Sequence, residues 1–473
     1  MNKRHIFFIL LSVTAVMYGC SAKKAVTGTP VTALPETYTG NRDSIDASMV
    51  TNAYFFKDDS LRSLITAAIT ENLDLQNAYQ NIQIARASLR NARGLMLPTA
   101  NGLFAPNIRK FGFYTMDGAG NATTEIQPGK LIPVHLPDYF AGFQSSWEPD
   151  IYGKLKNQKQ AALARYLSTI EGKNWLQTNI INTLVLTYYE ILALDEQLQI
   201  IQQNIQLQQE MLEMIETQKE AARTTALAID QFKAQILNAR TLAKELEQAI
   251  LENEKMMNLL LSRYPKPVQR NRNWLLEQPA VVSTGIPSQL LQNRTDIRMA
   301  QYELEASRFD VEVARKSFYP TLTINATVGL QAFSPATFFN AQSVAYGLFG
   351  GLLAPVFNRS ALKAQFNTQT ALQLQALNNY QQTMLTAFGE VYTGMRKIDN
   401  ISQAIQLKTE EVKVLENAIE NARLLFQSNR ADYLEVLTAQ QNLLEAKLSL
   451  VQLKKNQYQE TANLFKAIGG GWK

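Results

Sequence analysis

The sequence repeats one pattern of elements in its two halves, and this duplication limits the folds that the chain can adopt. Asp74 matches Asp296 and Pro98 matches Pro320, and the residues between them keep one constant offset. Each copy reads as a short helix, two strands, a very long helix and a return helix. A repeat that is too small to bury its own apolar face takes its core from its neighbours. We therefore expect the two copies to depend on further packing partners.

The pattern predicts a mainly α-helical chain with a small β part and an internal tandem repeat. Two strands, at about 99–114 and 138–148, precede long helices within 154–262 in the first copy, and strands at about 319–332 and 342–357 precede long helices within 360–468 in the second. The predicted segments are a signal peptide at 1–19, a lipidated N-terminal tether at 20–60, a first repeat at 61–265, a linker at 266–284 and a second repeat at 285–473.

The first twenty residues have the form of an export signal. Lys3 and Arg4 precede an apolar run from Ile6 to Met17, which is too short to cross a bilayer as a helix. Cys20 follows a small residue at the expected cleavage site, and the segment resembles a bacterial lipoprotein box in which this cysteine carries lipid. Ser21 then resembles an outer-membrane sorting signal. The alternative is an ordinary signal peptide with an incidental cysteine.

Composition argues against several classes of function. A net charge of +5 without a basic run is too little for a nucleic-acid-binding surface. The chain has one cysteine, Cys20, and two histidines, His5 and His135, so it cannot supply a His-rich or Cys-rich metal site, a Cys–His dyad or a disulfide. We predict no cofactor, no metal and no catalysis.

The proline-free stretches predict unusually long helices. Apolar residues step by three and four from Ile191 through Ile201 to Ile215, with Gln208 as a polar interruption. This seven-residue rhythm is typical of a packed seam between helices, and about 65 helical residues would span roughly 100 Å. The opposite faces are rich in Gln, Asn, Ala, Thr and Ser. Such a surface suits the wall of a water-filled duct, or equally an ordinary solvated helix face.

Segments of alternating polarity fit strands with two different faces. Between Tyr319 and Gln331, the even-numbered positions from Leu322 to Leu330 are apolar and lie on one side. The odd-numbered positions from Thr321 to Gln331 are mostly polar and lie on the other. A membrane-barrel strand needs this pattern, although a soluble hairpin packed on helices would show it too. Four strands cannot close a barrel in lipid, where open edges are excluded. Three chains would supply twelve strands.

Several motifs resemble the outer-membrane efflux factors of the TolC family, closest to the lipoproteins that serve resistance-nodulation-division pumps. They are Gly285–Arg298, Ser317–Pro320, Ser146–Gly153, Ala431–Leu437 and Ala467–Trp472. The resemblance implies a homotrimer in the outer membrane of a Gram-negative bacterium, with a twelve-stranded β-barrel in lipid and an α-helical barrel in the periplasm. It also implies two partners, a periplasmic adaptor and an inner-membrane pump. The implied function is export of drugs or other small toxic compounds.

By position in this family, the helical tips would contact the adaptor. They are Ala222, Arg223 and Thr224 in the first copy, and Ser428, Asn429 and Arg430 in the second. Glu435 matches an acidic ring that narrows the closed entrance, whereas Thr438 stands where a second acid is usual. The alternative is that Glu435 only solvates a helix face. Two other functions stay open: a duct for type I protein secretion, and a coiled-coil scaffold that transports nothing.

Overall fold

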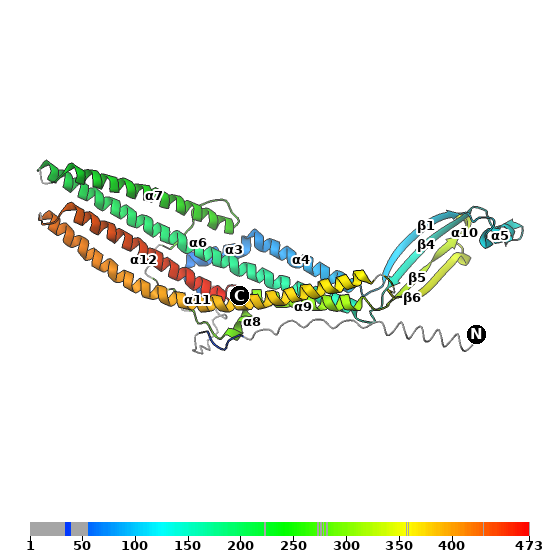
Figure 1. Cartoon of the computed structure of the whole chain (residues 1–473). Coiled ribbons are helices and arrows are strands. Elements are labelled where there is room, and N and C mark those ends of the chain that lie inside the picture. Colours follow the sequence, from blue (N-terminus) through cyan, green and yellow to red (C-terminus); the bar gives the residue numbers. More distant parts are fainter. Residues whose placement is uncertain are drawn as a thin grey trace. The chain divides into compact units, whose positions relative to one another are not determined.

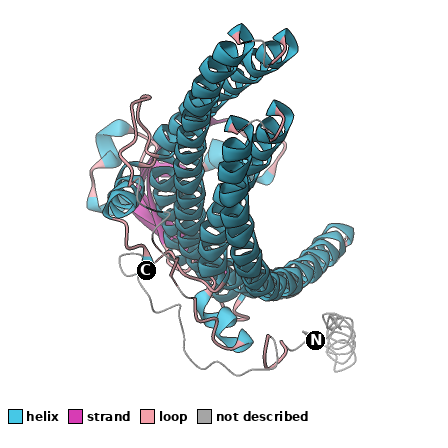
Figure 2. Cartoon of the chain, turned by 90° about the vertical axis from the view of Figure 1, so that its left-hand side faces the viewer, coloured by secondary structure: helices cyan, strands magenta, loops and turns pink. Residues whose placement is uncertain are grey.

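The computed structural model describes residues 34–38, 55–221, 224–271, 274, 277, 279–280, 282–355, 357, 359–428 and 430–472. The predicted signal peptide, Cys20 and most of the 20–60 tether therefore lie outside the described residues. The chain forms two compact units. We call Gln83–Tyr166 with Tyr302–Leu377 the strand unit, and we call the described parts of Pro30–Ile82, Leu167–Gln301 and Asn378–Lys473 the hairpin unit. Figure 2 shows that most of the described chain is helical.

The strand unit contains one antiparallel four-stranded sheet. Its strands are β1 (Thr99–Arg109), β4 (Leu136–Trp147), β5 (Thr321–Ala332) and β6 (Val344–Leu353), in the order β1-β4-β5-β6 (Figure 1). Within the described residues, β1 pairs only with β4 and β6 only with β5. Both edges of this sheet therefore carry backbone groups that no described strand satisfies.

The strand register gives the sheet one apolar and one polar face. Residues directly opposite each other on paired strands share a face, and Val328 lies opposite both Phe143 and Tyr346. The apolar face carries Phe104, Ala141, Phe143, Ile324, Ala326, Val328, Leu330, Tyr346, Leu348 and Leu352. The other face carries Asn101, Asp138, Gln144, Thr323, Asn325, Thr327 and Gln331, interrupted by Leu103, Phe140, Phe349 and Leu353.

The strand expected over 99–114 ends early, at Arg109, because the chain turns at Gly112. The Gly112 carbonyl accepts hydrogen bonds from the Thr115 backbone N–H at 3.0 Å and from its hydroxyl at 2.8 Å. Thr115 then caps helix α5 (Met116–Thr123), which is followed by the small hairpin of β2 (Glu125–Gln127) and β3 (Lys130–Leu131). The shorter loop between β5 and β6 contains helix α10 (Pro335–Phe338).

Two long helical hairpins dominate the rest of the chain. Helix α6 (Lys154–Glu220) returns through α7 (Ala226–Leu260), and α11 (Ser360–Gln427) returns through α12 (Tyr433–Ala467). The outgoing helices have 67 and 68 residues and both return helices have 35. The short helices α4 (Leu73–Gly94) and α9 (Thr295–Lys316) both have 22 residues. These matching lengths support the predicted duplication.

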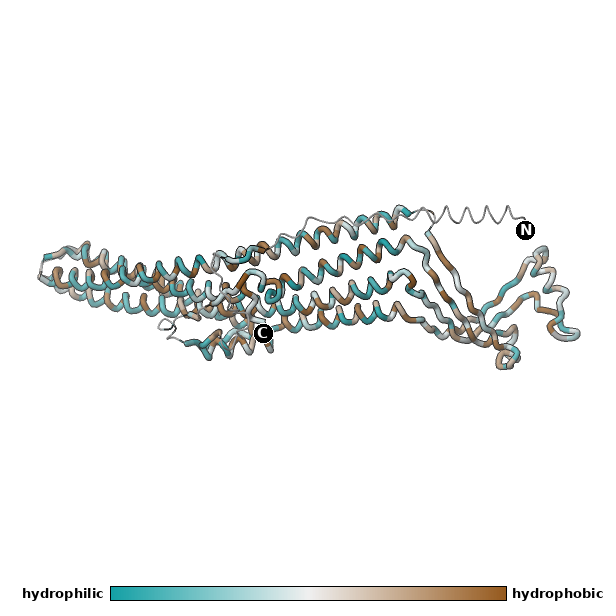
Figure 3. The backbone as a smooth tube through the Cα atoms, turned by 90° about the horizontal axis from the view of Figure 1, so that it is seen from below, coloured by the Kyte–Doolittle hydropathy of each residue, from teal (hydrophilic) through white to brown (hydrophobic). Residues whose placement is uncertain are grey.

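Side-chain contacts in the hairpin unit link α7 to α6, α6 to α12 and α12 to α11, and α7 also packs against α12. The linking contacts are Lys233 with Glu216 at 3.1 Å, Lys455 with Glu190 at 2.8 Å, and Gln457 with Ser402 at 3.0 Å. Figure 3 shows apolar and polar residues alternating along these helices, as the heptad ladder predicts. None of the helices in the described part of the chain combines the length and the apolarity needed to cross a bilayer.

The main core of the hairpin unit lies where the return helices end. Tyr188, Ile191 and Leu184 of α6 are fully buried there. The interpretation of 20–60 as a tether is incomplete, because the aromatic side chains that the structure describes in this segment are buried in this core. Phe55 stacks on Phe465 with a ring-centroid distance of 3.9 Å, and Tyr38 stacks on Phe388 at 5.3 Å. Burial of aromatic surface holds these parts of the N-terminal segment on the hairpin unit. Helix α3 (Asp59–Glu71) follows directly.

Candidate functional site

The free ends of the two hairpins share a small apolar core. Met211 and Ile215 of α6, Phe232 of α7, and Val436 and Leu437 of α12 pack together there, with Phe426 of α11 completing the contact. These side chains are buried, and this fixes the direction in which each turn leaves its hairpin. Both tips are therefore held by one core of the hairpin unit.

The tip residues predicted to meet an adaptor are only partly described. Ala222, Arg223 and Asn429 lie outside the described residues. Ser428 and Arg430 are exposed, and Thr224 is half-buried. The Ser428 hydroxyl donates to carbonyls of its own helix at 3.0 Å, and the Arg430 backbone N–H donates to the Leu425 carbonyl at 2.8 Å. These bonds close the end of α11 and leave the polar side chain of Arg430 at the surface.

Glu435 is exposed in the first turn of α12. A carboxylate is favoured at this position because unpaired backbone N–H groups give a helix N-terminus a partial positive charge. The next two residues, Val436 and Leu437, are buried in the tip core, so the backbone that carries Glu435 is firmly placed. Thr438 donates its hydroxyl to the Leu434 carbonyl at 2.8 Å. Glu435 is thus the only one of these two positions that offers a charge.

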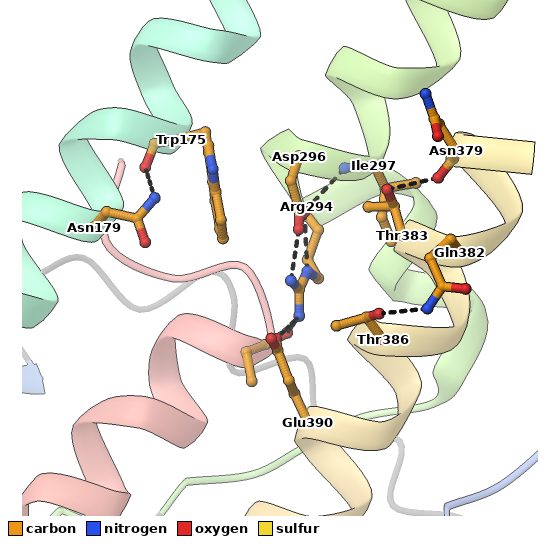
Figure 4. Close-up of polar contacts among 11 residues, drawn as sticks. Trp175, Asn179, Arg294, Asp296, Ile297, Asn379, Gln382, Thr383, Thr386 and Glu390 are labelled. Atoms are coloured by element: carbon orange, nitrogen blue, oxygen red, sulfur yellow. Dashed lines mark hydrogen bonds and ion pairs between the residues drawn. The ribbon is translucent and has the colours of Figure 1, made fainter. Parts of the chain in front are cut away.

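A second constellation, which the sequence did not assign, surrounds Arg294 (Figure 4). Arg294 is 2% exposed and makes a bidentate contact with Asp296, at 3.0 and 2.6 Å. Its Nη1 donates to Glu390 at 2.6 Å and to the Ala467 carbonyl at 3.1 Å. Burial alone would lower the pKa of Arg294, but the carboxylates of Asp296 and Glu390 outweigh burial and raise it. The guanidinium is therefore a permanent cation that joins the start of α9 to α11 and α12.

The C-terminal tail closes over the same place. The Trp472 indole N–H donates to the Asn293 carbonyl at 3.2 Å, and the Arg298 guanidinium lies 5.8 Å from the centre of the Trp472 ring. Gly469 has a φ of 93°, and a Cβ there would come within 2.7 Å of the Asn293 backbone. Only glycine fits this approach. The motifs 285–298 and 467–472, which are far apart in the sequence, thus meet in one cluster.

Glu171 is buried beside this cluster with only one of its oxygens paired. Arg298 Nη2 contacts Glu171 Oε1 at 2.5 Å, whereas the buried Oε2 has no hydrogen-bond partner among the described residues. Burial raises the pKa of Glu171, and Arg298 and Asn174 oppose that shift only in part. Elsewhere in the described chain, no three His, Cys, Asp or Glu side chains gather as a metal site would require.

Comparison with known proteins finds a family match in the second half of the chain. Residues 286–470 match the sequence model of the family "Outer membrane efflux protein", and the match includes most of both motifs around Arg294. This part of the chain is similar in sequence to outer membrane efflux proteins. Its resemblance to the TolC family is therefore confirmed, and like its relatives it is a channel component and not an enzyme.

Relatives of this chain cover most of its length. It is 25% identical over 419 residues to the cation efflux system protein CusC of Escherichia coli O6:H1, which covers 88% of this chain and 87% of CusC. It is 25% identical over 473 residues to the probable outer membrane lipoprotein SilC of Salmonella typhimurium, covering 98% of each. The open-state MtrE outer membrane channel of Neisseria gonorrhoeae superposes with a TM-score of 0.82 at 19% identity, over 96% of this chain and 99% of MtrE. This last similarity confirms the predicted fold.

Proposed function

We propose that three copies of this chain form the passive outer-membrane duct of a tripartite efflux system. The family consists of outer-membrane components of such pumps, which work with an adaptor and an inner-membrane pump. The chain supplies a conduit and a gate, and the pump supplies the energy. We further propose that the pump is of the resistance-nodulation-division class, that the exported compounds are small and toxic, and that the pump selects them.

The two-faced sheet with open edges carries this proposal. A sheet edge in lipid leaves N–H and C=O groups without partners, which the bilayer does not tolerate. β1 and β6 would satisfy each other if β6 of one copy paired with β1 of the next, and because the four strands alternate in direction this pairing is again antiparallel. Two copies would give eight strands, a number whose interior fills with side chains. Three is the smallest number of copies that leaves room for passage.

The hairpin unit offers a matching surface for the next copy. Helices α7 and α11 each expose large apolar side chains. They are Leu227, Leu237 and Leu251 on α7, and Leu385, Leu407 and Val414 on α11. Leu407 and Val414 are one heptad apart, as in a coiled-coil seam. Pairing α7 of one copy with α11 of the next would close a ring of twelve helices.

At the tips, we propose that 222–224 and 428–430 contact the adaptor and that three Glu435 side chains line the entrance. Three carboxylates around one axis repel each other and attract cations. We also propose that Cys20 is lipidated and anchors the N-terminus in the outer membrane.

The test is the mass and conductance of the full-length protein purified in detergent. We expect a particle of three chains by light scattering, and ion-conducting single channels after reconstitution in planar bilayers. A cell that lacks the protein should become more sensitive to toxic compounds. A monodisperse single chain without affinity for lipid would refute the duct and favour a scaffold. Loss of a secreted protein, without a change in drug sensitivity, would favour a type I secretion duct.

A further inference from the structure

A cavity of ≈ 220 Å³ lies between the two hairpins of the hairpin unit, close to their tips. Its walls come from α6, α11 and α12, and most of the lining side chains are apolar, such as Leu207, Met211, Ile419 and Leu443. An apolar cavity of about 150 Å³ is enough to hold benzene. This cavity therefore has room for a small organic molecule.

Two amides in the wall of this cavity lack hydrogen-bond partners. Asn204 of α6 and Gln440 of α12 are each 8% exposed, and Oδ1 of Asn204 and Oε1 of Gln440 accept no hydrogen bond from any described residue. One turn along α6 from Asn204, Gln208 is 3% exposed and its Oε1 is unpartnered too. Gln208 is the polar interruption of the apolar ladder. A buried carbonyl oxygen without a hydrogen-bond partner is unfavourable. A ligand that donates a hydrogen bond to one of these oxygens would therefore be stabilised here.

The other polar groups around the cavity set the charge of a suitable ligand. Glu210 and Glu420 contribute two negative charges, and Arg423 and Lys447 contribute two positive ones. Lys447 is already paired with Glu416 at 2.9 Å. Charges of both signs therefore lie in the lining, and no cluster of one sign is present there to hold an ion. The amide oxygens favour a hydrogen-bond donor, and the apolar walls favour a short hydrocarbon body.

We propose that this cavity binds a small neutral amphiphile, a primary alcohol of about six carbons by volume. Its hydroxyl donates to Asn204 or Gln440, and its alkyl chain lies against the apolar walls. Because the cavity is bounded by α6 from one hairpin and by α11 and α12 from the other, an occupant bridges the two hairpins. If the chain is a gated duct, as proposed above, such a ligand stabilises one arrangement of the two tips.

The experiment measures binding of 1-hexanol to the full-length protein in nanodiscs by saturation-transfer NMR, with empty nanodiscs subtracted. Hexane, which has the same hydrocarbon body but no donor, is the matched probe. We expect saturable binding of 1-hexanol that is about tenfold tighter than that of hexane, which is the effect of roughly one hydrogen bond. The double variant Asn204→Leu/Gln440→Leu removes both acceptors and should lose this preference.

Two variants keep the result interpretable. Gln209→Leu changes an exposed amide of α6 outside the cavity wall and should bind 1-hexanol as wild type does. If the double variant fails to assemble, the single variant Gln440→Met provides the test. It preserves side-chain volume and should weaken binding of 1-hexanol. Equal binding of 1-hexanol and hexane, unchanged binding in the variants, or occupancy by water alone would each overturn the proposal. Since binding is measured without transport, a failed duct would be seen separately in the conductance test.

Discussion

Arg294 is a buried cation whose charge is balanced by carboxylates from two different helices. Replacing it with Met would leave Asp296 and Glu390 facing each other without their common partner. Breaking a buried ion pair by removing one member costs roughly 3–5 kcal/mol. We expect Arg294→Met to lower the thermal unfolding midpoint of the protein clearly, and Arg294→Lys to restore it only in part, because lysine cannot make the bidentate contact. Arg240→Met, at an exposed position of α7, is the control. Equal midpoints for the two Met variants would contradict this role.

Glu171 should make stability depend on pH. The pKa of Glu171 is raised in the folded protein, so its contribution to stability is fully present below the unfolded pKa of about 4.3 and is lost as the pH rises through the folded pKa. From pH 4 to pH 7, wild type should therefore lose stability relative to Glu171→Gln, which cannot ionise. Chemical denaturation of both proteins across this range measures the difference. Exposed Glu245→Gln should follow wild type, and parallel curves for wild type and Glu171→Gln would reject the effect.

Glu435 is the candidate charge at the entrance. Replacing it with Ala should reduce the preference of single channels for cations over anions, because three carboxylates are lost from one ring. Reversal potentials in planar bilayers under a salt gradient measure this preference. Glu445→Ala, at an exposed position further along α12, is the control. Unchanged ion selectivity in Glu435→Ala would mean that this residue only solvates a helix face.

The sequence identified these residues unequally. Glu435 and the tips were assigned from the family resemblance and stay predictions. Of these positions the structure describes Thr224, which is half-buried, and Ser428, Arg430 and Glu435, which are exposed. The role of Arg294 could not be derived, although its motif was recognised. Its partners Glu390 and Ala467 lie about a hundred or more residues away in the sequence. Spacing along the chain does not reveal which distant side chains will meet at a buried charge.

At the scale of elements, the two faces of the sheet are the best test of a barrel in lipid. Val328 lies on the apolar face and its neighbour Thr327 on the polar face. A lysine facing lipid near the bilayer midplane costs about 2–4 kcal/mol, whereas a lysine facing water costs little. We expect Val328→Lys to reduce the amount of assembled protein in outer-membrane fractions strongly, and Thr327→Lys to assemble normally. If both variants assembled alike, the assignment of the faces would be wrong.

Alternation predicted β5 well, because its polarity changes at every residue from Thr321 to Gln331. The end of β1 was predicted too late. The aromatic residues after Lys110 are common in strands, but Gly112 and Thr115 form a turn there. The long helices were predicted from the absence of proline and from the heptad ladder. Periodicity could not show which of the four long helices contact one another, because this depends on which seams pair in space.

At the scale of the whole molecule, the chain leaves two kinds of surface uncovered within its described residues. The edges of the sheet lack partners, and helices α7 and α11 expose large apolar side chains. Both are explained if neighbouring copies cover them, with β6 of one copy on β1 of the next and α11 of one copy on α7 of the next. A single chain that kept these surfaces in water would be prone to aggregate.

Charges placed at the exposed apolar positions of α11 should therefore block assembly without unfolding the chain. Leu407 is 70% exposed and Val414 65%, so replacing both with Asp disturbs little within one copy. At a seam between copies, the same change buries two unpaired charges per interface, which is costly. We expect Leu407→Asp/Val414→Asp to shift the particle from three chains towards one by light scattering, with unchanged helical circular dichroism. Lys413→Glu, adjacent but already charged and exposed, should stay trimeric. A trimeric double variant would show that α11 faces solvent, and that closure of the duct, if it occurs, uses another helix face.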